Sequence, residues 1–212
     1  MSRLARLHAV TDREILERSD FVELAARLLR AGPLALHLRA RGSNGRLLLD
    51  RSRELCATFP ETAILVNDRV DVARIAGAGA HLPEAGLTPA QARTILGPGP
   101  LLGRSVHTPE AAGRRAAELD FLVYGHVFPT PSKPDLAPRG TSGLTAAARA
   151  ASRVGLPLIA VGGVTPGRVG LALAAGAYGV AAVSGIWDAA DPGAAAEAYL
   201  QELERGMACS SP

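Results

Sequence analysis

Short apolar runs alternate with amphipathic segments along almost the whole chain. Segments 21–31, 46–59 and 109–119 carry apolar residues at three- and four-residue spacing, which is typical of one buried helix face. The pattern predicts eight strands, at 7–11, 35–40, 63–67, 80–83, 101–106, 121–125, 157–162 and 179–184. Strands that alternate with helices in this way indicate stacked βα units around a parallel sheet.

The number of these units predicts a closed (β/α)8 barrel, the TIM-barrel architecture of the α/β class, because about eight units in ~200 residues are its minimum complement. No composition shift or charge run divides the chain, so we expect one domain over 1–206 and a short C-terminal tail over 207–212, which lacks apolar periodicity. An open, doubly wound sheet is the alternative. No dinucleotide-type glycine fingerprint follows the first strand, which disfavours that alternative. Three helices should begin at a Thr-Pro pair, at Thr88, Thr108 and Thr165.

Composition and charge exclude several classes of function. The chain is 48% hydrophobic but only 4% aromatic, so its core must consist of small aliphatic contacts. Its net charge of +3 comes from dispersed basic residues, which suits a small anionic ligand and argues against nucleic acid. Two cysteines give neither a disulfide framework nor a metal-ligand spacing, so a reducing cytoplasm is expected. Glycines interrupt the longest uncharged stretch, 169–187, and we expect no membrane span.

Glycine-rich loops follow the last two predicted strands. The first reads Ala-Val-Gly-Gly-Val-Thr-Pro and contains Gly163, and the second reads Val-Ser-Gly-Ile and contains Ser184, Gly185 and Ile186. Backbone N–H groups beside a helix N-terminus bind phosphate, and glycine lets an oxyanion approach them closely. In a (β/α)8 barrel, functional residues lie in the loops after the strands, and phosphate sites often lie after the last two. The alternative is that these glycines only form tight turns.

Ordered sequence blocks stand at the predicted strand ends: Leu-His-Ala-Val-Thr-Asp at 7–12, His-Leu-Arg at 37–39, Asn-Asp-Arg-Val-Asp at 67–71, Gly-Arg-Ser-Val-His at 103–107, Tyr-Gly-His-Val-Phe-Pro-Thr-Pro-Ser-Lys-Pro at 124–134, and the two glycine-rich loops. Together they resemble the thiamine phosphate synthase and thiazole tautomerase superfamily. These ordered blocks cover nearly the whole chain. The resemblance implies a thiamine-biosynthesis enzyme that binds a small phosphorylated thiazole, with a homodimer as an expected assembly.

Two features place the chain nearer the tautomerase branch. The synthase pattern has an Asp in Asn-Asp-Arg, present here as Asp68, and a second Asp after the fourth strand, where this chain has Gly86. Mg²⁺ tolerates little geometric error, so Glu84 is a poor substitute. His126 in Gly-His-Val-Phe resembles the acid/base of the tautomerase. We therefore expect a thiazole tautomerase that aromatises a carboxythiazole phosphate by metal-free proton transfer at His126.

The alternative is a thiamine phosphate synthase, which joins a pyrimidine diphosphate to the thiazole phosphate with Mg²⁺. Asp68 would then be a metal ligand, and Lys133 lies in a Thr-Pro-Ser-Lys-Pro segment that resembles the diphosphate-binding loop of the synthase. A barrel that binds the ligand without catalysis is a third possibility. A histidine at a strand end is also often a hydrogen-bonding cap, which is the alternative for His126.

The other candidate substrate-binding residues are polar or glycine positions in the same loops: Arg39, Asn67, Ser105, Lys133 and Gly140. The Arg39 guanidinium suits a carboxylate or phosphate, with an ion pair to Asp12 or Asp68 as the alternative. Ser105 suits an oxyanion, or a turn or helix cap. We expect structural roles for three other histidines, with His8 and His81 in the core and His107 before a helix.

Overall fold

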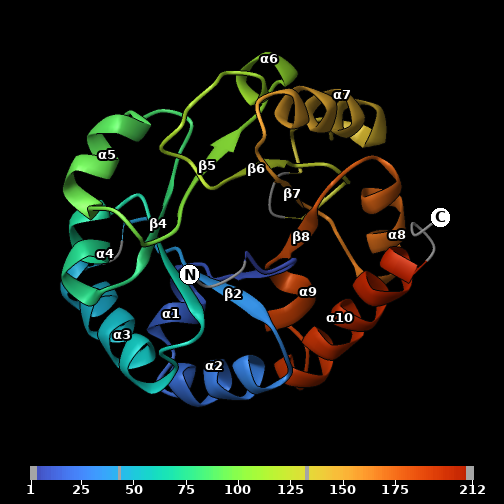
Figure 1. Ribbon diagram of the computed structural model, residues 1–212. Coiled ribbons are helices and arrows are strands. Elements are labelled where there is room, and N and C mark those ends of the chain that lie inside the picture. The colour runs from blue at the N-terminus through green and yellow to red at the C-terminus, as the bar shows by residue number, and fades with distance from the viewer. Residues whose placement is uncertain (1–3, 43, 132–133, 209–212) are drawn as a thin grey trace.

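The computed structural model describes residues 4–42, 44–131 and 134–208, and over these residues the strands form a closed parallel barrel in chain order (Figure 1). The strands are β1 (Leu7–Val10), β2 (Leu34–Leu38), β3 (Ala63–Asn67), β4 (Gly79–Leu82), β5 (Leu102–Val106), β6 (Phe121–Gly125), β7 (Leu158–Val161) and β8 (Gly179–Ala182). β8 pairs with β1 and closes the ring. The expected (β/α)8 fold is therefore confirmed, and all eight strands lie within two residues of their predicted starts.

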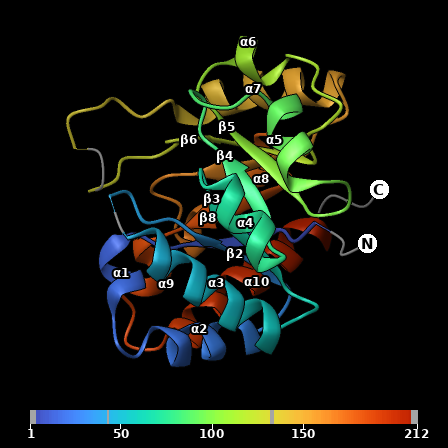
Figure 2. The same cartoon turned by 90° about the vertical axis from the view of Figure 1, so that its left-hand side faces the viewer.

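Helices cover the outside of the barrel (Figures 1 and 2). They are α1 (Arg13–Glu17), α2 (Phe21–Arg30), α3 (Gly45–Thr58), α4 (Val70–Ala76), α5 (Pro89–Leu96), α6 (Pro109–Ala112), α7 (Gly140–Arg153), α8 (Pro166–Ala174), α9 (Ser184–Trp187) and α10 (Pro192–Ala208). α6 is much shorter than the predicted 109–119 helix, because Gly113 follows its first turn and disfavours continuation. α10 extends to Ala208, two residues into the segment expected to be the tail.

Helix caps fix where several loops end. Thr88 forms a capping box with Gln91 at the start of α5, and the Thr108 hydroxyl accepts from the Ala111 N–H at the start of α6. Thr165 precedes Pro166 as expected, but its side chain makes no capping hydrogen bond. Two of the three predicted caps therefore act through their side chains.

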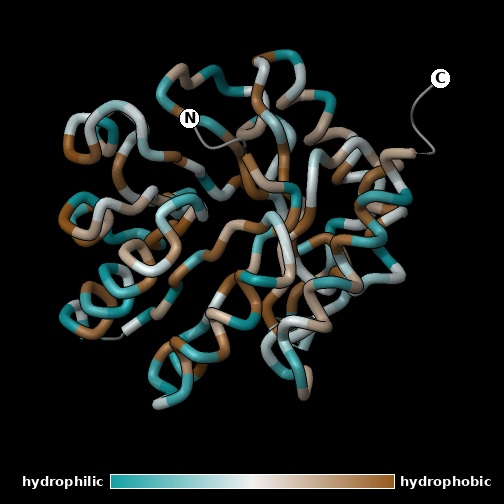
Figure 3. The backbone as a smooth tube through the Cα atoms, turned by 60° about the horizontal axis from the view of Figure 1, so that its bottom comes forward, coloured by the Kyte–Doolittle hydropathy of each residue, from teal (hydrophilic) through white to brown (hydrophobic). Residues whose placement is uncertain are grey.

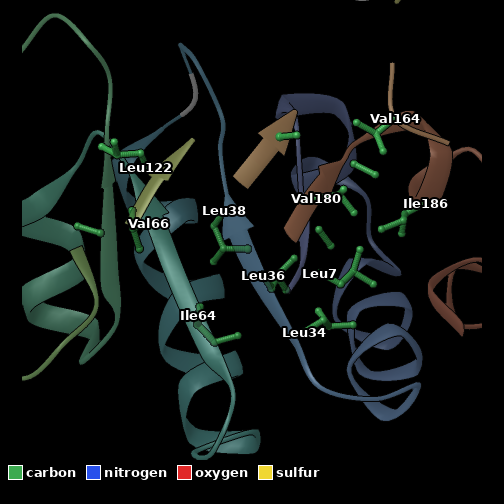
Figure 4. Packing of buried hydrophobic residues seen from close by; sticks show 14 of the residues in the cluster. Leu7, Leu34, Leu36, Leu38, Ile64, Val66, Leu122, Val164, Val180 and Ile186 are labelled. Atoms are coloured by element: carbon green, nitrogen blue, oxygen red, sulfur yellow. The ribbon is translucent and has the colours of Figure 1, made fainter. Parts of the chain in front are cut away.

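Alternation along the strands divides the core into two layers. Outward-facing aliphatic residues such as Leu36, Val66 and Leu122 pack beneath the helices (Figure 4), and apolar positions follow the strands in Figure 3. A separate cluster fills the barrel interior: Val10, Ala35, Leu65, Phe121, Val123, Ile159 and Ala181. No helix among the described residues has the length and apolar character needed to cross a bilayer.

Phe121 is the largest side chain of this inner cluster. It is fully buried, and its ring lies where a Cβ on Gly103 of the neighbouring strand would overlap it. The glycine on β5 therefore makes room for the ring. Barrel interiors are usually filled by branched aliphatic residues, but here three buried histidines, His8, His37 and His81, share the space beside Phe121.

Candidate active site

An exposed carboxylate stands where β3 ends. Asn67 is the last residue of the strand, and Asp68 adopts a left-handed conformation with φ of 67°. Its backbone N–H donates to the His81 carbonyl oxygen at 2.9 Å, which holds the turn in place. A non-glycine residue in this conformation costs free energy, of order 1 kcal/mol or more, and such costs are often retained at functional sites. Among the described residues, the Asp68 carboxylate makes no hydrogen bond or ion pair.

The loop after β4 supplies no second carboxylate to this position. A Cβ on Gly86 would lie 3.9 Å from Asp68 Oδ1, so a side chain at residue 86 would begin beside that carboxylate. Glu84 is committed elsewhere, because its Oε2 lies 2.7 Å from His107 Nδ1 and its Oε1 accepts from the His107 N–H. The structural role expected for His107 is thus observed. The described residues contain no group of three His, Cys, Asp or Glu side chains placed to hold a metal.

Arg39 reaches the barrel mouth from the end of β2. Its backbone exchanges hydrogen bonds with Thr11, whose hydroxyl donates to the Arg39 carbonyl and accepts from the Arg39 N–H. Burial of the guanidinium and its proximity to Arg41 lower the pKa of Arg39, whereas Asp12 opposes that shift. Within the described chain, the guanidinium has no salt bridge to Asp12 or Asp68, so the ion-pair alternative is not observed. The positive charge remains available to an anion.

Two backbone turns face one another after β7 and β8. Gly163 has φ of 63°, and a Cβ there would overlap the Pro129 carbonyl oxygen. Ser184 and Gly185 begin α9, and their N–H groups have no hydrogen-bond partner among the described residues. The N–H of Ile186, in contrast, donates to the Val183 carbonyl at 3.0 Å. The turns therefore offer N–H donors at Ser184 and Gly185 but not at Ile186.

A tyrosine that sequence analysis missed braces both turns. Tyr199 of α10 is fully buried, and its hydroxyl donates to the Val164 carbonyl oxygen at 2.8 Å. The same hydroxyl occupies the space where a Cβ on Gly185 would stand. Burial raises the pKa of Tyr199 to about 12, so the hydroxyl keeps its proton and remains a donor. The apolar spacing of the helix around Tyr199 indicates only that this residue belongs to the core.

This contact predicts a rescue between two substitutions. We expect Gly185→Ala to lower the melting temperature by about 5 °C, because overpacking costs roughly 1–3 kcal/mol. Tyr199→Phe removes the obstructing oxygen, so the double variant should melt higher than Gly185→Ala alone. Gly167→Ala is the matched control, since a Cβ there meets nothing within 4 Å. Additive losses in the double variant, measured by calorimetry, would contradict the contact.

His126 supports the loop between β6 and α7. It is 7% exposed, and its Nε2 lies 3.1 Å from the Leu136 carbonyl oxygen, to which it donates. The His126 carbonyl accepts from the Arg139 N–H, and the Gly140 N–H donates to the Val127 carbonyl oxygen. This geometry matches the alternative role for His126, a hydrogen-bonding cap at a strand end. The Gly140 N–H already donates to a backbone carbonyl within the chain. Lys133, the remaining substrate-binding candidate, lies outside the described residues.

A parallel (β/α)8 barrel with an exposed carboxylate, a cation and free N–H groups after its strands has the features that are typical of barrel enzymes that bind phosphate. The sequence profile described as "Thiamine monophosphate synthase" matches residues 7–186, and the chain belongs to this family.

Individual relatives agree with that assignment. A protein of Salinispora arenicola named thiamine-phosphate synthase is 38% identical over 210 residues, covering 96% of this chain and 99% of the relative. A bifunctional thiamine-biosynthesis protein of Symbiobacterium thermophilum is 44% identical over 158 residues, covering 73% of this chain and 32% of the longer relative. A solved structure named thiamine phosphate pyrophosphorylase, from Pyrococcus furiosus, has a TM-score of 0.79 at 27% identity, covering 96% of this chain and 97% of that one.

These relatives overturn the expected branch. Curated relatives such as the Salinispora arenicola protein are named thiamine-phosphate synthase, which is a transferase, so the prediction of a thiazole tautomerase, an isomerase, was wrong. The error came from giving Gly86 and His126 too much weight. The absence of one carboxylate does not by itself change the reaction that an enzyme catalyses. The acid/base role of His126 was expected only because the chain was interpreted as a tautomerase.

Proposed function

We propose that the protein is a thiamine-phosphate synthase, which joins a pyrimidine diphosphate to a thiazole phosphate and releases diphosphate. Full-length similarity to relatives bearing that name carries the proposal. The exposed Asp68 carboxylate and the free N–H groups of Ser184 and Gly185 support it, because the reaction needs separate sites for a metal-bound diphosphate and a phosphate. A homodimer stays a prediction.

The two anionic groups are assigned to different parts of the mouth. The N–H groups of Ser184 and Gly185 bind the thiazole phosphate, and Gly163 allows the close turn beside them. Arg39 and Asn67 bind the diphosphate from the ends of β2 and β3. His126 holds the β6–α7 loop through the Leu136 carbonyl and transfers no proton.

Asp68 is the residue that would hold Mg²⁺. Mg²⁺ is commonly bound by one or two protein carboxylates, with substrate phosphates and water as the remaining ligands, so a single carboxylate fits the ion. When bound, the ion neutralises charge on the departing diphosphate. The Arg39 guanidinium adds a fixed positive charge, which shares the neutralisation of the diphosphate with the metal.

The proposal is tested by incubating the protein with pyrimidine diphosphate, thiazole phosphate and Mg²⁺ and measuring thiamine phosphate by fluorescence after oxidation. We expect product that requires both substrates and is lost when a chelator removes the metal. Calorimetric binding of thiazole phosphate without any product, with and without added Mg²⁺, would replace the synthase with a non-catalytic ligand-binding barrel.

A further inference from the structure

Three buried histidines form a hydrogen-bonded chain through the barrel interior. His8 Nδ1 lies 2.7 Å from His37 Nε2, and His37 Nδ1 lies 3.0 Å from His81 Nδ1. At one end, His8 Nε2 lies 3.0 Å from the carbonyl oxygen of Ala5. At the other end, His81 Nε2 lies 3.0 Å from Ser105 Oγ, on the strand that leads to the barrel mouth. The chain thus connects the lower end of β1 to the candidate active site.

The imidazoles of this chain are neutral at neutral pH. All three rings are buried, and among the described residues they hydrogen-bond to one another, to a carbonyl and to a hydroxyl but to no carboxylate, so a charge on them would be buried without a partner. Burial also lowers the pKa of His8 to about 4 and that of His37 well below its usual range. Each ring therefore carries one N–H and one acceptor nitrogen.

The Ala5 carbonyl oxygen fixes the direction of every bond, because a carbonyl only accepts. His8 must carry its proton on Nε2, which leaves Nδ1 as the acceptor for His37 Nε2–H. His37 Nδ1 is then an acceptor, so His81 must carry its proton on Nδ1. His81 Nε2 has a lone pair and must accept, and the donor within reach is the hydroxyl of Ser105.

We propose that this histidine chain, His8–His37–His81, orients Ser105 so that its proton points into the barrel and its oxygen lone pairs face the mouth. Ser105 then acts as a hydrogen-bond acceptor for an N–H or O–H group of the bound substrate. In this proposal it does not donate to a phosphate oxygen, which differs from the oxyanion contact expected from the sequence. The histidines are positioning residues, and the substrate contact rests on the proposed synthase function.

The tautomers give a test that is independent of activity. The chain has five histidines, so long-range ¹⁵N–¹H correlation spectra of ¹⁵N-labelled protein at pH 7.5 contain five imidazole patterns. We expect the Nδ1–H pattern for His81 and the Nε2–H pattern for His8 and His37, assigned by loss of each signal in single His→Gln variants. An Nε2–H pattern or an imidazolium pattern for His81 would overturn the proposal.

A matched pair of variants separates hydrogen bonding from packing. His37→Phe breaks the chain in the middle, and we expect His81 to adopt the Nε2–H tautomer and donate to Ser105. Phe121→Leu is the control, because the Phe121 ring contacts all three imidazoles, with centroids 5.3, 6.1 and 6.2 Å away, without hydrogen bonding to them. In that variant His81 should keep the Nδ1–H pattern.

Kinetics test the consequence for the substrate. We expect His37→Phe to lower kcat/KM by about tenfold, the usual value of one hydrogen bond, and to have almost no further effect in a Ser105→Ala background. The effect of Phe121→Leu on kcat/KM should be the same whether residue 105 is serine or alanine. Equal effects of His37→Phe with and without Ser105 would refute the positioning role. If the protein shows no synthase activity at all, the spectra still decide the orientation of the chain.

Discussion

Replacing Asp68 by asparagine is expected to lower Mg²⁺-dependent kcat/KM for thiamine phosphate formation by about 10³-fold. The asparagine side chain has nearly the same shape but lacks the negative charge that attracts the metal. Metal stabilisation of a departing phosphate is worth several kcal/mol, and each 1.36 kcal/mol is a factor of ten in rate. Asp68 is the proposed carboxylate for this role, because Glu84 is bound to His107 and residue 86 is glycine.

Asp71→Asn is the matched control for this prediction. Asp71 lies three residues further on, at the start of α4, and it forms an exposed ion pair with Arg69. Exposed pairs contribute little to stability, so the control should retain activity within about twofold. Initial rates should be measured across a Mg²⁺ titration for both variants. A wild-type Mg²⁺ dependence in Asp68→Asn would show that Asp68 does not hold the metal.

The sequence predicted the fold well because the signals for it are local and repeated. Apolar runs of strand length alternate with amphipathic segments, and about eight such units in ~200 residues are the complement of a closed barrel. The N-caps at Thr88 and Thr108 could also be read from a Thr-Pro pair. The helix after Thr108 was predicted too long, because apolar spacing continued beyond Gly113 although the backbone turned there.

The candidate site was predictable only in part. The strand-end rule placed Asp68, Arg39 and Ser105 at the barrel mouth, since each lies within one residue of the end of a predicted strand. The contacts that modify their roles join residues far apart in the chain, as Tyr199 does with Val164 and His81 with Ser105. No spacing within one segment encodes such contacts. Sequence analysis treated His8 and His81 as separate core residues, whereas the barrel brings them onto one hydrogen-bonded chain through His37.

That buried chain also predicts a steep loss of stability in mild acid. Between pH 7.5 and pH 5, the free energy of unfolding should fall by about 4 kcal/mol from His8 and His81 alone. In the unfolded chain, both titrate near 6.5, but in the folded protein their pKa values are lowered to about 4 and about 3. The unfolded state therefore binds more protons below pH 6.5. The stabilisation is complete above that pH and is lost as the pH falls toward the folded values.

Each of the two histidines thus contributes about 2 kcal/mol of this loss at pH 5, and His37 acts in the same direction. A total of about 4 kcal/mol is a large share of the 5–15 kcal/mol that stabilises a typical domain. Most carboxylates stay ionised down to pH 5, so the window from 7.5 to 5 isolates the histidines. Urea unfolding at several pH values measures the effect, and a flat stability over this window would contradict it.

The slope of stability against pH identifies which histidines are responsible. His8→Gln should destabilise the protein at pH 7.5, because it interrupts the chain, but it should also make the loss in acid shallower by nearly one proton. His107→Gln is the control, since the partner of His107 is the carboxylate of Glu84 and the residue lies outside the buried chain. The acid loss that comes from the buried chain should persist in this variant. A variant that only disrupts packing lowers stability equally at every pH, so a change in slope assigns the proton uptake to the buried chain.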